Sequence, residues 1–126
     1  MSHCLDRLPD FRRGDTFDIP MTIVNSTTGL PIDISGYVFT TTLKADTADA
    51  DSAAKWQVTK TATGPDAVLG KITLSVAASI TYAIEPGAYV LDVQRTIPGV
   101  EPQVRTLLYQ AIRCLPDVTR GTPPTP

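Results

Sequence analysis

The chain has 126 residues, enough for one domain with its own hydrophobic core. Apolar residues make up 42% and charged residues 19%, a globular composition, and 11 basic against 13 acidic residues leave a net charge of −2. The basic residues form no cluster with interleaved aromatic residues, so the sequence predicts no nucleic-acid surface. No apolar run approaches the roughly 20 residues that cross a bilayer, and residues 1–10 lack the apolar core of a signal peptide. We therefore expect no membrane partner and folding in a cytoplasm.

Alternation of apolar and polar residues with a period of two dominates the chain and predicts β-strands. The first predicted strand alternates clearly, and its Pro20 favours an edge strand or a bulge because proline cannot donate to a ladder. In chain order, strands are predicted at residues 16–24, 30–34, 37–44, 55–61, 71–76, 88–95 and 104–115.

Turn chemistry separates these segments. Residues 45–54 are small and acidic and predict an exposed loop, residues 63–66 predict a turn, and residues 77–84 predict one short helical turn. Pro98-Gly99 marks a hairpin before the last strand.

About seven short strands with regular turn signals predict an all-β antiparallel sandwich, either immunoglobulin-like or jelly-roll-like, with flexible termini. We assign residues 1–10 to an N-terminal arm, residues 11–119 to the β-sandwich domain and residues 120–126 to a Pro-rich C-terminal tail. Trp56, the only tryptophan, is expected to pack in the core.

The two cysteines, Cys4 and Cys114, are too few for a disulfide framework and lack zinc-site spacing. A bridge between them would tie the arm to the last strand. The alternative is two thiols, with Cys114 as a small core residue, which a reducing compartment favours.

No residue set predicts catalysis or metal binding. His3, the only histidine, stands beside Cys4, and sequence neighbours on an extended arm point apart, so they do not form a nucleophile–base pair. Asp46, Asp49 and Asp51 share one loop, but that loop lacks the glycine that turns a calcium-binding segment, which favours a solvated acidic loop.

Other polar residues also have structural explanations. Arg13-Gly14-Asp15 matches a cell-adhesion tripeptide, but Gly-Asp before a strand is ordinary turn chemistry. Asp92 projects to the face opposite its apolar neighbours and, if that face is covered, needs a partner such as Arg95 or Arg105. No spacing selects a glycosidase pair among the carboxylates Asp18, Asp33, Glu85 and Asp92. We expect no enzyme, no catalytic residue, no cofactor, no metal and no small-molecule substrate.

Four segments in order resemble a known family. They are Arg13-Gly14-Asp15-Thr16-Phe17, Gly29-Leu30-Pro31-Ile32-Asp33-Ile34-Ser35-Gly36-Tyr37, Gly70-Lys71-Ile72-Thr73-Leu74-Ser75 and Pro86-Gly87-Ala88-Tyr89-Val90-Leu91-Asp92-Val93. This order resembles the small immunoglobulin-like domain at the N-terminus of phage upper baseplate proteins, and is similar to stand-alone versions among tailed-phage structural proteins. The motifs have structural roles: Asp33 or Ser35 caps backbone N–H groups, and the Tyr89 hydroxyl reaches a backbone group at a corner.

The resemblance implies a non-enzymatic structural protein of a tailed-phage virion, assembled in the host cytoplasm. It would act as a tail or baseplate adaptor that docks fibres or receptor-binding proteins, and it would form a homo-oligomer. One alternative is a capsid decoration (cement) protein that clamps neighbouring capsid subunits. Another is a carbohydrate-binding module, whose binding would depend on Trp56 or Tyr82.

Overall fold

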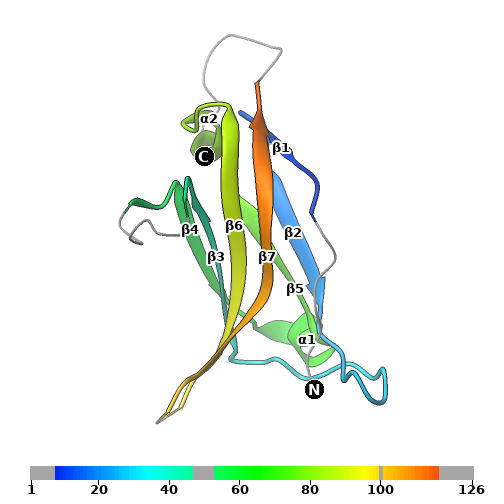
Figure 1. Ribbon diagram of the computed structural model, residues 1–126. Coiled ribbons are helices and arrows are strands. Elements are labelled where there is room, and N and C mark those ends of the chain that lie inside the picture. Colours follow the sequence, from blue (N-terminus) through cyan, green and yellow to red (C-terminus); the bar gives the residue numbers. More distant parts are fainter. Residues whose placement is uncertain (1–7, 47–52, 100, 117–126) are drawn as a thin grey trace.

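The computed structural model describes residues 8–46, 53–99 and 101–116 (Figure 1). Within these ranges the chain forms seven strands and two short helices. In chain order these are β1 (Phe11–Arg12), β2 (Phe17–Thr22), β3 (Val38–Lys44), β4 (Trp56–Thr61), α1 (Gly64–Val68), β5 (Lys71–Val76), α2 (Ala78–Tyr82), β6 (Gly87–Ile97) and β7 (Gln103–Leu115). Most of the predicted arm, the end of the predicted domain and the whole predicted tail lie outside the described residues.

The strands form two sheets. One has five strands in the order β1-β7-β6-β3-β4, and the other pairs β2 with β5 (Figure 1). All neighbours are antiparallel except β1 and β7, which are parallel. The predicted all-β, sandwich-like fold is confirmed.

The strand order favours the immunoglobulin-like alternative. In immunoglobulin folds the strands G, F and C are neighbours in one sheet, C′ extends that sheet beyond C, and B and E are neighbours in the facing sheet. Here β7, β6, β3 and β4 take the places of G, F, C and C′, and β2 and β5 take those of B and E.

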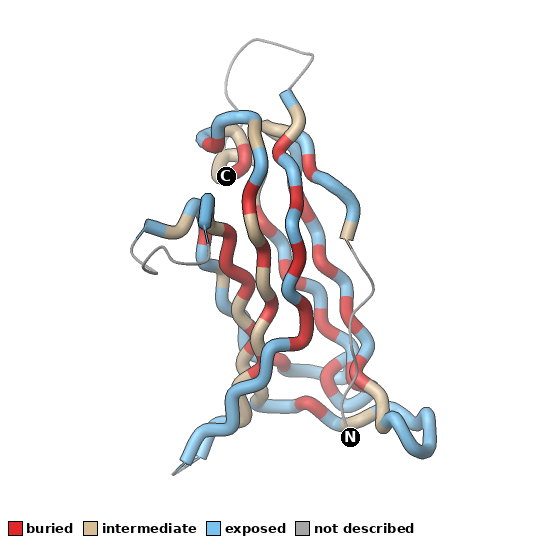
Figure 2. Tube along the Cα trace, in the orientation of Figure 1, coloured by how far each residue is buried: buried red, intermediate tan, exposed pale blue. Residues whose placement is uncertain are grey.

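The core lies between the inward faces of the sheets, where buried and exposed residues alternate along the strands (Figure 2). Buried and exposed residues alternate without interruption along β2 and β5, because each of these strands buries only one face. Each large side chain removed from water contributes about 1.5–3 kcal/mol, so this row of residues is the main source of stability. The largest fully buried apolar side chains are Phe39, Ile19, Ile23, Ile34, Leu43, Leu74, Leu91 and Ile112.

Three aromatic rings close one part of this core. The ring centroids of Phe11, Phe17 and Trp56 lie 5.0–6.0 Å apart in tilted and edge-on arrangements. Trp56 is 4% exposed, so the prediction that it packs in the core is confirmed.

The corner before β6 depends on Tyr89. Its ring is buried, and its hydroxyl donates a 2.5 Å hydrogen bond to the carbonyl oxygen of Glu85, four residues earlier. This is the geometry of the tyrosine corner at the start of strand F in immunoglobulin folds. Burial, together with the nearby Cys114 and Glu85 charges, raises the pKa of Tyr89 above its usual value.

The predicted strand at residues 30–34 was wrong. These residues form only an isolated bridge between Val24 and Pro31. The backbone N–H of Ile32 donates to the carbonyl of Ile23, whereas that of Ile34 donates to the carbonyl of Ala67. The segment crosses from one part of the sandwich to another, so no single neighbouring strand can pair along its length. Of its three alternating apolar residues, Ile34 is buried in the core, Ile32 is partly buried and Leu30 is 65% exposed.

The corner after this segment forms as expected. The Asp33 carboxylate accepts a 2.9 Å hydrogen bond from the Ser35 backbone N–H, and the following Gly36 has φ of +85°. Hydrogen bonds from the Ser35 hydroxyl and from this N–H lower the pKa of Asp33 below its usual value.

A strand that the sequence did not predict, β1, pairs with the end of β7 through two residues. The preceding residues, which we assigned to the arm, also lie along β7. The Gln110 side chain exchanges hydrogen bonds with the backbone N–H and carbonyl of Leu8, and Asp10 accepts from the Arg113 backbone N–H. A two-residue strand is too short to show a period, so only the packed structure locates it.

Two short helices flank β5. Residues 63–66 were predicted as a turn, and they open the short helix α1 instead. Gly70, between α1 and β5, has φ of +75°, and its carbonyl accepts a 2.8 Å bond from the Ile23 N–H. The predicted helical turn at residues 77–84 is confirmed as α2.

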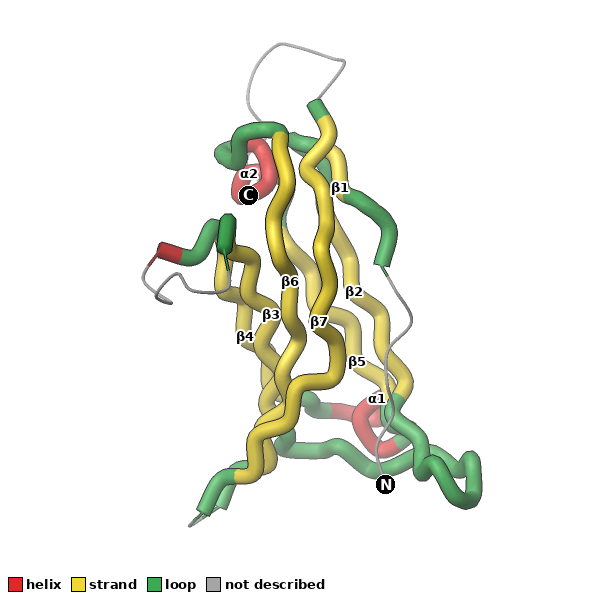
Figure 3. Tube along the Cα trace, viewed as in Figure 1, coloured by secondary structure: helices red, strands yellow, loops and turns green. Residues whose placement is uncertain are grey.

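The longest strands, β6 and β7, form a hairpin that projects beyond the rest of the sandwich (Figures 1 and 2). The register between them shifts at Val93/Gln94, which marks a β-bulge. A bulge increases the local twist, and the hairpin bends away from the body past this point (Figure 3). On β7, residues 103–106 of the projecting part are all exposed.

Candidate functional site on the outer sheet face

The outer face of the five-stranded sheet has no covering layer within the described part of the chain. Here β3 and β6 present partly buried residues in alternation with the core residues of the inner face. Strand register aligns these side chains in rows across the sheet. One row contains Gln57, Thr42, Asp92 and Tyr109, contributed in turn by β4, β3, β6 and β7.

Side-chain hydrogen bonds order the β4–β3 half of this face. The Gln57 amide donates to the Thr42 hydroxyl at 3.3 Å, and the hydroxyls of Thr40 and Thr59 bond to one another at 3.1 Å. Such cross-strand polar pairs stabilise a sheet face that is in contact with water. They also fix the positions of polar groups before any ligand arrives.

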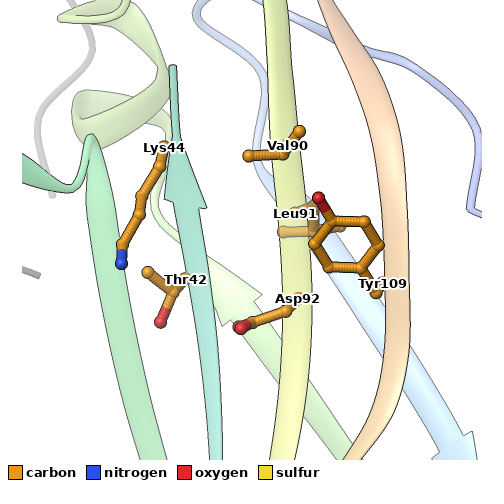
Figure 4. A pocket seen from close by; sticks show the side chains of 6 residues that line it. All are labelled: Thr42, Lys44, Val90, Leu91, Asp92 and Tyr109. Atoms are coloured by element: carbon orange, nitrogen blue, oxygen red, sulfur yellow. The ribbon is translucent and has the colours of Figure 1, made fainter. Parts of the chain in front are cut away.

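A shallow hollow lies on the β3–β6–β7 half of the face. It holds about 100 Å³ and is lined by Thr42, Lys44, Val90, Leu91, Asp92 and Tyr109. Figure 4 shows the side chains of Lys44, from β3, and Tyr109, from β7, on the two sides of Val90. The residue opposite Val90 on β7 is Ala111.

Asp92 projects to the outer face, as predicted, where it is half-buried beside Tyr109. Arg95, one of the two partners considered for it, belongs to the buried set on the inner face and is only 4% exposed. The other, Arg105, is exposed and lies opposite Arg95 in the hairpin. The charged neighbour that shares the hollow with Asp92 is Lys44.

The sequence analysis missed Tyr109, which is 60% exposed and is the largest exposed aromatic side chain of the described residues. The signal was present, because counting back in steps of two from the buried Ile112 places Gln110 inside and Tyr109 outside. The two aromatic residues considered for sugar binding are placed differently. Trp56 is buried, and Tyr82 is half-buried with the Arg13 guanidinium 4.4 Å from its ring centroid.

The Arg13-Gly14-Asp15 segment forms a turn attached to α2. The Arg13 side chain donates to the Tyr82 carbonyl at 2.8 Å, and the Gly14 N–H donates to the Thr81 hydroxyl at 3.1 Å. The same hydroxyl donates to the Asp15 carbonyl at 2.7 Å. These contacts give the tripeptide a structural role as turn chemistry.

The remaining candidate residues do not converge. His3, Cys4, Asp49 and Asp51 lie outside the described residues, and Cys114 is buried next to the Ile84 carbonyl. The four carboxylates considered for glycoside hydrolysis lie on separate elements, and one of them, Asp18, accepts a 2.7 Å hydrogen bond from the Ser75 hydroxyl.

Two other features are absent from the described ranges, a cluster of metal ligands and a membrane-spanning helix. No group of three or more potential metal ligands occurs in them. No helix in them has the length and apolar character needed to cross a membrane.

No family model matches the chain, and no curated protein matches it. Inference about the outer face therefore rests on its residues.

Proposed function

We propose that this protein is a non-enzymatic structural component of a tailed-phage virion, in which it acts as an adaptor that docks fibres or receptor-binding proteins on the tail or baseplate. The observation that supports this most is that sequence motifs shared with the resembled baseplate domain lie at the corners of an immunoglobulin-like sandwich. Asp33 caps one corner and Tyr89 closes another, as expected from the chemistry of these residues. These roles build a scaffold, and a scaffold that presents surfaces suits an adaptor.

The projecting β6–β7 hairpin supplies a docking element. Its β7 strand is exposed near the tip, where Val104 is 59% exposed. Exposed apolar side chains on a protruding hairpin gain contact area when a partner surrounds them. The hairpin is anchored by the long β6–β7 pairing in the body of the sheet, so it would enter a partner as a preformed element.

Open strand edges supply a second means of assembly. β4 ends the five-stranded sheet on one side, and β2 pairs on one side only within the described residues, as its Pro20 predicted. Unpaired edges accept strands from other chains. In contrast, the edge of β7 is partly covered by β1. The proposed homo-oligomer would use the β4 edge, the β2 edge or both.

Deleting the gene from the phage and analysing the purified particles by mass spectrometry and electron microscopy tests the proposal. We expect tails that lack fibres or receptor-binding proteins and that regain them when the protein is supplied. Particles with a full set of fibres in its absence would refute the adaptor function.

A pair of surface variants tests the hairpin separately. Val104→Asp, at the tip, is expected to reduce incorporation of the protein into particles. Val68→Asp is the matched control, because Val68 is also an exposed valine, at 54%, but lies on α1. Equal incorporation of the two variants would show that the hairpin does not dock.

A capsid decoration protein is the second candidate, because a projecting hairpin also suits a clamp between neighbouring capsid subunits. Copy number separates the two. Gel densitometry of purified particles would give tens of copies for a tail adaptor and hundreds for a shell protein. Hundreds of copies would favour the shell over the tail.

A further inference from the structure

The hollow on the outer face is large enough for one small ring or a group of similar size. Its volume of about 100 Å³ is well below the roughly 300–1,000 Å³ of pockets that enclose a drug-sized ligand. It is open to solvent on one side, so a bound group would keep one face in water. A single ring at the end of a larger molecule fits such a site better than an extended chain.

The lining has no net charge and is therefore compatible with a neutral ligand. Lys44 and Asp92 bring one positive and one negative charge to the same small space. The two charges act on a bound ion with opposite sign and largely cancel, so the lining gives neither a cation nor an anion a net advantage. A carboxylate has about four acceptor positions and an ammonium has three donors, so both groups can bond to hydroxyls in addition to any protein neighbour.

Tyr109 adds a flat apolar surface beside these charges. Its ring is 60% exposed, and Val90 lies next to it in the lining. An exposed aromatic ring next to polar groups suits a ligand with one apolar face and a polar rim. A pyranose ring has both features, since its axial C–H groups form the apolar face and its hydroxyls form the rim.

We propose that this hollow binds the ring of a neutral pyranose sugar, with Tyr109 stacking on its C–H face and Asp92 and Lys44 bonding to its hydroxyls. The proposal does not depend on the adaptor function, because it concerns a part of the surface away from the projecting hairpin tip. A sugar has about 12 non-hydrogen atoms and half of its surface would stay in water, so we expect dissociation constants in the millimolar range.

NMR titration of the ¹⁵N-labelled full chain with methyl glycosides of glucose, galactose and N-acetylglucosamine tests the proposal. At least one glycoside is expected to cause saturable amide shifts at residues 42–44, 90–92 and 109. Absence of saturable shifts with all three, up to their solubility limits, would overturn it. A parallel titration with N-acetyl-lysine methylamide tests a cationic occupant, and tighter binding of that probe than of any glycoside would also overturn it.

Variants then assign the contacts. Tyr109→Ala is expected to weaken binding at least about tenfold, whereas Tyr109→Phe keeps the stacking face and should stay within about threefold of the wild type. Asp92→Asn is expected to weaken binding and to leave the folded spectrum intact. Val104→Ala is the matched control, since Val104 lies on the same strand with 59% exposure and outside the hollow. Unchanged binding in Tyr109→Ala would overturn the assignment of the hollow.

Discussion

Replacing Tyr89 with phenylalanine is the most direct test of the corner before β6. The change removes one hydroxyl, which donates a 2.5 Å hydrogen bond to the Glu85 carbonyl, and keeps the buried ring. Such a bond contributes about 0.5–1.5 kcal/mol net, and an acceptor left unpaired costs about 1–3 kcal/mol. Glu85 is exposed, so water can replace part of the lost bond. We therefore expect a loss of about 1–2 kcal/mol in the free energy of unfolding.

Equilibrium denaturation in urea, followed by circular dichroism, measures this loss. At about 3–5 °C per kcal/mol for a chain of this size, the melting temperature should fall by roughly 3–10 °C. Tyr109→Phe is the control, because it removes the same hydroxyl from an exposed side chain, and we expect it to change stability by less than about 0.5 kcal/mol. Equal effects of the two substitutions would refute the structural role of the corner.

The raised pKa of Tyr89 gives this prediction a pH signature. The folded protein holds the Tyr89 proton more tightly than the unfolded chain, whose tyrosines titrate near 10.0. Stability from this group is therefore fully present below pH 10 and is lost as the pH rises through the pKa of the folded state. The wild type should lose more stability above pH 10 than Tyr89→Phe does, and parallel pH profiles would contradict the assignment.

Three further predictions concern the backbone and the core. Gly70→Ala should lower the free energy of unfolding by about 3 kcal/mol or more in thermal melts, because a Cβ there would lie closer than 3.0 Å to two backbone carbonyl oxygens. Gly29→Ala is the control, because Gly29 has a similar φ but a Cβ there would have no atom within 4 Å, so the loss should be about 1–2 kcal/mol. Leu91→Ala should cost about 2–5 kcal/mol in urea denaturation, whereas the 65%-exposed Leu30 should tolerate the same change, and equal costs would contradict the burial pattern. Trp56 should emit at short wavelength and resist acrylamide quenching in the native state, and rapid quenching would place it at the surface instead.

The alternation of side chains was enough to predict most of the scaffold. It located β2, β3, β4, β5, β6 and β7, because burying one face of a strand requires an apolar residue at every second position. It also predicted that Trp56 is buried and that Pro20 lies on a strand paired on one side. These features are local, since each depends on the order of residues within one segment.

Two errors show where local patterns fail. Residues 30–34 alternate like a strand, but Ile34 serves as a single anchor where the chain crosses the sandwich. β1 has two residues and therefore no period at all, and it exists because the end of β7 offers it a backbone edge. Both outcomes depend on which segments lie nearby, which alternation does not encode.

The candidate site depends even more on tertiary structure. Lys44, Asp92 and Tyr109 come from three strands, and their meeting depends on the register of β3 with β6 and of β6 with β7. A shift of one residue in either register would turn one of these side chains to the opposite face. The sequence by itself determined which residues face outward; the packed sheets alone decided which of them became neighbours, because pairing between distant strands is fixed by the shared core.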